Sequence, residues 1–185
     1  MLAIIQSIAT QTGRHATTIE GFLTRFRGRI QSLASTQDLV TSSNWRGADL
    51  RDLVTGQVGR YASDPQRSLH FEGESPYLNP NAALHIGLAL HELTVNSVSY
   101  GALARPDGDV TLKARILDTP AGQSLELVWS EAISLADQEM GQKRFGSVAL
   151  ERVVPTSLNG SAALDISSDR LEYRLVVPAG NFESE

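Results

Sequence analysis

The spacing of apolar residues changes its period along this chain, and this change restricts the fold more than any other feature. In residues 2–40, apolar positions recur at the spacing of amphipathic helices. From residue 110 onward, apolar and polar residues alternate in segments such as VTLKARIL and LELVWSE, which is typical of half-buried strands. The chain therefore predicts an α+β fold, with a pair of helices first and then a mostly antiparallel sheet that carries helices on one face.

Two helices are predicted in the first 43 residues. The first covers residues 2–12 and is expected to end at Gly13. The second begins after a cap at Thr17 or Thr18 and runs to about Val40. Its apolar seam has nearly the 3.5-residue period of paired antiparallel helices. The seam residues are Phe22, Phe26, Ile30, Leu33, Gln37 and Val40, of which the polar Gln37 is interpreted as a seam-edge residue.

A polar, turn-rich segment, TSSNWRG, separates this helical hairpin from the rest of the chain. We therefore predict a hairpin domain over residues 1–43 and a second domain over residues 44–182. Within the second domain a long helix is expected to begin at Asn79-Pro80 and to end before Gly101. The other expected elements are a helix at 48–61, a strand at 68–73, a helix at 145–154 and a final hairpin formed by SAALDI and LEYRLVV.

Composition excludes several classes of site. The chain has no Cys, so it has no disulfide, no cysteine zinc site and no thiol nucleophile. The formal net charge of −5 argues against a nucleic-acid groove, which would need a basic stripe. No apolar run approaches the roughly 20 residues of a membrane span, and the first residues lack the pattern of a signal peptide. A cytoplasmic protein without membrane insertion is the expectation.

The long helix carries an unusual polar stripe. On a helical wheel its members are His85, Ala89, Glu92, Asn96 and Ser99. Glu92 and Asn96 are one turn apart and therefore neighbours. An amide oxygen at this spacing can bind Mg²⁺, and a carboxylate can accept a proton or orient a nucleophile. The alternative is that the stripe is the solvent-exposed side of a surface helix.

Three further features have both a functional and a structural interpretation. His91 lies among the apolar residues of the long helix, where it is either catalytic or simply buried and hydrogen-bonded. Glu131 shares the strand parity of Trp129, so it either faces the apolar side as an acceptor for a ligand or lies beyond the strand in solvent. The segment Phe145-Gly146-Ser147 precedes a helix, where it forms either a phosphate contact or a turn.

Taken together, these motifs resemble one family. His91-Glu92-Leu93 followed by Asn96 and Tyr100-Gly101-Ala102-Leu103 resembles the N box of the HWE family of sensor histidine kinases. The family is named for this His and for a later Trp-x-Glu, which here reads Trp129-Ser130-Glu131. The first helices, the segment NWRGADLRDLV and the segment FGSVALERVVPTSLNG also resemble parts of the family.

The resemblance implies a helical hairpin followed by a Bergerat-type (GHKL-like) α/β sandwich that binds ATP and Mg²⁺. It implies that Asn96 is the Mg²⁺ ligand, that Glu92 with His91 serves catalysis, and that Trp129-x-Glu131 meets the adenine. It further implies that Arg144, Gly146 and Ser147 border the phosphates. The acceptor histidine of the family precedes the residues that match Met1 and Leu2, so we expect it before this chain.

A catalytic core of this kind would be a homodimer and would pass phosphate to the receiver domain of a response regulator. The sequence departs from the family pattern at three places. Ser99 stands where the family often has Lys or Arg, and Ala132-Ile133-Ser134 replaces a Gly-Gly-Pro run. Arg144 stands where the family usually has Gly. These departures keep two alternatives open. One is a degenerate kinase fold that binds a response regulator without catalysis, and the other is an ATPase without a phosphohistidine step.

Overall fold

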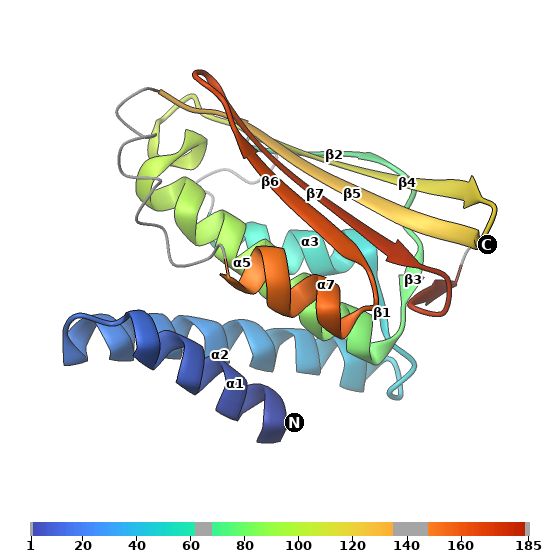
Figure 1. The fold of residues 1–185 in the computed structure, drawn as a ribbon, viewed down its shortest axis with the longest axis horizontal. Helices are drawn as coiled ribbons and strands as arrows, with labels where there is room; N and C mark the ends of the chain where they lie inside the picture. The colour runs from blue at the N-terminus through green and yellow to red at the C-terminus, as the bar shows by residue number, and fades with distance from the viewer. Residues whose placement is uncertain (1, 62–67, 135–147, 184–185) are drawn as a thin grey trace.

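The computed structural model describes residues 2–61, 68–134 and 148–183, and its elements lie in three layers (Figure 1). The first layer is a five-stranded sheet, the second consists of α3, α5 and α7, and the third is the pair α1 and α2 (Figure 1). The helices are α1 (Leu2–His15), α2 (Ile19–Ser42), α3 (Leu50–Val58), α5 (Pro80–Tyr100), η1 (Ala102–Ala104), η2 (Ala149–Val153) and α7 (Val154–Ser157). The predicted α+β class, with helices on one face of the sheet, is confirmed.

The strands form two sheets. The larger has the order β2-β4-β5-β7-β6, with β2 parallel to β4 and all other neighbours antiparallel. The smaller has the order β1-β3-β8. The strands are β1 (Ala48–Asp49), β2 (Leu69–Gly73), β3 (Tyr77–Leu78), β4 (Val110–Thr119), β5 (Gly122–Ala132), β6 (Ser161–Ile166), β7 (Arg170–Pro178) and β8 (Phe182–Glu183).

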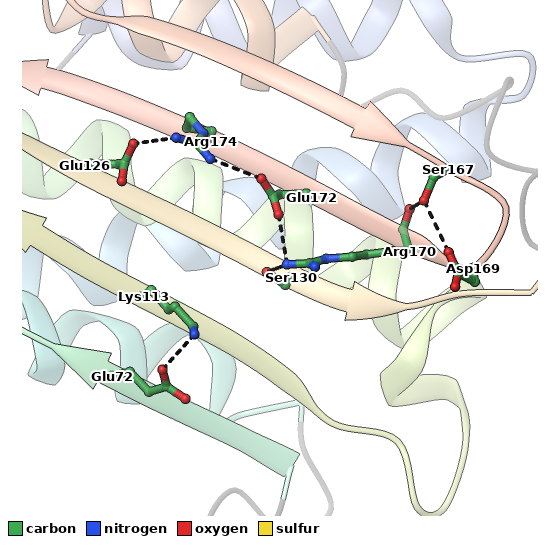
Figure 2. Close-up of polar contacts among 9 residues, drawn as sticks. All are labelled: Glu72, Lys113, Glu126, Ser130, Ser167, Asp169, Arg170, Glu172 and Arg174. Atoms are coloured by element: carbon green, nitrogen blue, oxygen red, sulfur yellow. Dashed lines mark hydrogen bonds and ion pairs between the residues drawn. The ribbon is translucent and has the colours of Figure 1, made fainter.

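The two faces of the larger sheet differ in the way that the alternating pattern predicts. The face toward the helices buries Leu112, Leu127, Trp129 and Leu175 in the main hydrophobic core. The opposite face carries charged pairs, which include Arg174 with Glu126 at 2.7 Å, Arg170 with Glu172 at 2.9 Å and Lys113 with Glu72 at 3.0 Å (Figure 2). These pairs keep the outer face polar, while isolated exposed pairs contribute little to stability.

The helical hairpin differs from its prediction in two respects. First, α1 does not end at Gly13 but continues to His15, because one Gly in a helix costs only about 1 kcal/mol relative to Ala. Second, the most buried positions of α2 include only Leu33 and Val40 of the predicted seam. The remaining buried residues of α2 are polar: Arg29, Ser32, Ser35 and Thr36. The reason is that α2 packs on α3 and α5 as well as on α1, and on that side its polar groups have partners.

The cap of α2 and the connection to β1 follow the sequence. Thr18 is the N-cap, and its hydroxyl accepts a hydrogen bond from the amide of Gly21 at 3.0 Å. After α2 the chain reverses through Asn44 and Trp45, both of which have positive φ angles. The predicted turn is therefore present. None of the described helices combines the length and the apolar character needed to cross a membrane.

Candidate functional site

Helix α5 carries most of the predicted site residues, and its position is fixed at both ends. Asn79 caps the start, where its side-chain oxygen accepts from the amide of Ala82 at 2.8 Å and its amide donates to the carbonyl of Gly180 at 2.7 Å. At the other end, the amide of Gly101 donates to the carbonyl of Ser97 at 2.8 Å. Both predicted ends of this helix are confirmed.

Glu92 is buried against α2. The Nε atom of Arg29 lies 2.6 Å from Oε1 of Glu92, and Nη2 lies 2.9 Å from Oε2, so the two side chains form a two-pronged ion pair. The third nitrogen of Arg29 donates to the hydroxyl of Thr12 on α1 at 2.9 Å. Only 7% of the Arg29 side chain and 10% of the Glu92 side chain are exposed. The solvent-side interpretation of the polar stripe is therefore wrong at Glu92.

His91 faces the same hairpin. It is buried, and its ring lies so close to α2 that a Cβ at Gly28 would be 3.3 Å from Nε2. The hydroxyl of Tyr61 approaches Nδ1 at 3.5 Å. Burial lowers the pKa of His91; Glu92 partly offsets this shift, and the cations of Arg29 and Arg60 add to it. The imidazole is therefore neutral near pH 7, a state that suits a buried ring as well as a catalytic one.

Asn96 lies one turn beyond Glu92 and is half-buried. Among the described residues its carboxamide has no hydrogen-bonding partner. A half-buried amide without a protein partner can bond solvent, and the same position is accessible to a ligand. Ser99, one turn further on, is exposed. Within the described residues, no group of three or more His, Asp or Glu side chains is arranged to hold a metal ion.

Glu131 is the second buried carboxylate. Strand β5 continues to Ala132, and Glu131 is only 3% exposed, so the prediction that it faces the apolar side is confirmed and the solvated alternative is wrong. Its Oε2 accepts from the hydroxyl of Ser97 at 2.5 Å and from the amide of Ala102 at 2.8 Å. Within the part of the chain that the structure describes, its Oε1 is approached only by Nε1 of Trp129, at 3.4 Å. Trp129 itself is completely buried, and its contact with the site is this approach of its indole nitrogen to Glu131.

The predicted residues thus fall into two groups. Glu92 and His91 lie against the hairpin, whereas Glu131 binds the C-terminal end of α5 through Ser97. Asn96 stands between the groups, because it is rotated by about 40° from Glu92 and by about 100° from Ser97 around the helix axis. The predicted phosphate contacts Arg144, Gly146 and Ser147 lie outside the described residues.

Sequence reasoning missed the partners of both carboxylates. Arg29 is one of several arginines on α2, and nothing in the sequence distinguishes it. Ser97 follows Asn96 directly but has no spacing signal toward Glu131, which is 34 residues away. Gly101 was expected only as a helix cap. Its φ of −111° suits any residue, and the reason for a Gly is that a Cβ would lie 2.3 Å from Oε2 of Glu131.

Comparison with known sequences supports the resemblance stated above. The family model for HWE histidine kinases matches residues 1–75. Blue-light-activated histidine kinases of Brucella ovis and Brucella anthropi are 23% and 24% identical to the chain over 177 residues, which is 96% of its length. The chain spans only 36% of the length of these relatives.

Solved structures with a similar fold are also histidine kinases. The blue-light-activated histidine kinase EL346 of Erythrobacter litoralis aligns with 96% of this chain and 58% of its own, with a TM-score of 0.59 and 12% identity. The separate histidine kinase domain of that protein aligns over 95% of both chains, with a TM-score of 0.58 and 10% identity. The resemblance to HWE histidine kinases and the Bergerat-type sandwich behind a helical hairpin are thereby confirmed.

Proposed function

We propose that this chain is the catalytic core of a sensor histidine kinase, which binds Mg²⁺-ATP and transfers the γ-phosphoryl group to a histidine. Relay to the receiver domain of a response regulator belongs to the same proposal. The similarity to histidine kinases supports the reaction class. The observation that carries the proposal at residue level is Asn96, a half-buried carboxamide without a hydrogen-bonding partner among the described residues.

Asn96 fits a Mg²⁺ ligand. Mg²⁺ prefers oxygen atoms and is commonly held by one or two protein side chains together with substrate phosphates and waters. When bound, the ion would neutralise charge that develops on the transferred phosphoryl group. The protein's own part is to hold the amide oxygen at a fixed place, which the capped helix α5 does.

Glu131 fits an acceptor for the exocyclic amine of adenine. Its Oε2 already accepts two hydrogen bonds, whereas Oε1 has, among the residues described, only the long contact with Trp129. A carboxylate has about four lone-pair sites, so Oε1 retains capacity for a ligand. We propose that Arg144, Gly146 and Ser147 border the phosphates, and that Glu92 accepts the proton of the attacking nucleophile with His91 beside it.

The hairpin is proposed to form a homodimer. Ile19 and Leu23, which are one turn apart on α2, expose 73% and 48% of their surfaces. Apolar side chains at i and i+4 form the stripe by which helices associate. A monomer in light scattering at micromolar concentration would contradict this part of the proposal. A cytoplasmic location stays a prediction from the sequence.

Calorimetric titration with Mg²⁺-ATP tests nucleotide binding. Wild-type protein should bind saturably, and Asn96→Ala should lose the Mg²⁺-dependent part of the affinity. Asn81→Ala is the matched control, because Asn81 is exposed on the same helix about 22 Å away. Equal affinity of Asn96→Ala and wild type would refute the role of Asn96.

One observation favours the non-catalytic alternative. Both oxygens of Glu92 are held by Arg29, so in this arrangement Glu92 cannot serve as a base. If wild-type protein binds no nucleotide at millimolar Mg²⁺-ATP, a dimeric module that binds a response regulator without catalysis becomes the better proposal.

A further inference from the structure

The surface between the hairpin and the helices α3 and α5 contains several polar contacts. Gln57 at the end of α3 accepts from the hydroxyl of Ser32 at 2.9 Å and donates to that of Thr36 at 2.9 Å. Arg60 donates to Ser35, and Arg29 pairs with Glu92. Interfaces between units that separate are more polar than a permanent core. The composition of this surface is therefore that of a contact which can open.

The core of the second domain depends on the hairpin only near the end of α2. Among the described residues, the main hydrophobic cluster includes Val40 near the end of α2 and no residue of α1. A small cavity also lies between the hairpin and α5, lined in part by Ile8, Leu33 and Leu88. Apolar packing across this surface is thus incomplete, and among the described residues the hairpin contributes to the main core only through Val40 and the partly buried Leu39.

While the hairpin is packed against α5, Arg29 determines whether the carboxylate of Glu92 has a free oxygen. It occupies both carboxylate oxygens and is itself fixed by Thr12, so the pair links all three helices α1, α2 and α5. A proton acceptor needs a free oxygen within reach of the nucleophile. We propose that Arg29 is a positioning residue that holds Glu92 inactive while the hairpin is docked, and that the pair must open before Glu92 can act.

This inference rests on the proposed kinase function. When the pair is open, Glu92 would accept the proton of the attacking nucleophile as the nucleophile bonds to the γ-phosphorus and the bond from phosphorus to ADP breaks. Removing Arg29 leaves Glu92 buried without a partner, which strongly disfavours docking. Because most of the main core lies outside the hairpin, the expected response is separation of the hairpin rather than unfolding.

Chemical labelling of Glu92 tests directly whether Arg29 holds this carboxylate while the hairpin is docked. The full chain is treated with a carbodiimide and an amine, and modification of Glu92 is followed by peptide mass spectrometry. Arg29→Gln should raise the labelling rate at least about tenfold, whereas Arg27→Gln, an exposed change on the same helix, should leave it unchanged. Equal labelling in Arg29→Gln and wild type would overturn the proposal.

A second variant, Gly87→Ala, should separate the hairpin from α5 without changing either residue of the Arg29–Glu92 ion pair. A Cβ at Gly87 of α5 would lie 2.6 Å from Oγ1 of Thr36, so Gly87→Ala disfavours docking by steric contact. Alanine also suits a helix interior, and α5 should therefore remain folded. Gly87→Ala should raise Glu92 labelling as well. If amide hydrogen exchange shows that α2 has separated from α5 in Gly87→Ala while Glu92 is still labelled at the wild-type rate, the proposed role of Arg29 is refuted.

Steady-state ATP hydrolysis, with water as the nucleophile, separates this role from a purely structural one. Arg29→Gln should raise kcat several-fold at unchanged KM, and Arg29→Gln/Glu92→Gln should cancel the rise. A fall in kcat for Arg29→Gln would overturn the proposal. If wild-type protein binds no Mg²⁺-ATP, the kinase proposal fails, and labelling alone still decides whether Arg29 holds Glu92.

Discussion

Substituting Gly101 by alanine should destabilise the protein strongly, because the carboxylate of Glu131 occupies the space that a side chain would need. A Cβ at Gly101 would lie 2.3 Å from Oε2 and 3.0 Å from Cδ of Glu131, and 2.9 Å from Cα of Ser97. The backbone of Ser97 belongs to α5 and cannot yield easily, so the carboxylate must move.

The magnitude follows from the bonds that the carboxylate would lose. Oε2 accepts from Ser97 at 2.5 Å and from the amide of Ala102 at 2.8 Å. Losing one hydrogen bond to a charged group costs about 1.5–3 kcal/mol, and overpacking adds about 1–3 kcal/mol. We expect Gly101→Ala to lower the free energy of unfolding by about 3–5 kcal/mol, a large share of the stability of an ordinary domain.

Denaturant unfolding measures this cost, with Gly56→Ala as the matched control. At Gly56, inside α3, the nearest atom to an added Cβ would be 3.9 Å away, so this change should stabilise by up to about 1 kcal/mol. In a Glu131→Ala background the cost of Gly101→Ala should shrink, because two of the three close contacts disappear. The reasoning is refuted if Gly101→Ala unfolds at the same denaturant concentration as Gly56→Ala, or if its cost is equal in both backgrounds.

Three further predictions concern stability. Tyr173→Phe removes a buried hydroxyl that donates to the carbonyl of Leu150 at 2.8 Å, and should cost about 1–3 kcal/mol in urea unfolding. Asn79→Ala removes the cap of α5 and should cost about 1–2 kcal/mol, whereas Asn79→Asp should retain most of the stability. Burial lowers the pKa of His91, so stability should fall as the pH drops below about 6.5, and His91→Gln should flatten that profile in thermal unfolding.

The sequence was sufficient to predict features that depend on neighbouring residues. The caps of α5 required only Asn79, Pro80 and Gly101, whose preferences are local. Strand parity with Trp129 gave burial as one of two interpretations of Glu131, because side chains alternate between the two faces of a sheet, and the continuation of β5 to Ala132 decided for it. The final hairpin followed from two alternating segments joined by a short polar turn.

Features that depend on partners far away in the sequence could not be predicted from it. Arg29 and Glu92 are 63 residues apart, and their contact depends on how closely α2 approaches α5. That approach is set by small residues at Gly28 and Gly87, which leave room for His91 and Thr36. The strands of the smaller sheet are two residues long, too short to show any period.

The two carboxylates of the site are held in place by different parts of the protein, although helix α5 carries Glu92 and contacts Glu131. Glu92 is held by the hairpin through Arg29, whereas Ser97 is held by the larger sheet through Glu131. Asn96 is adjacent to Ser97 in the same helical turn, so its position depends on the sheet side of α5. Movement of the hairpin should therefore change the availability of Glu92 without shifting Asn96. For this reason we expect Arg29 variants to change kcat while the affinity for Mg²⁺-ATP stays constant.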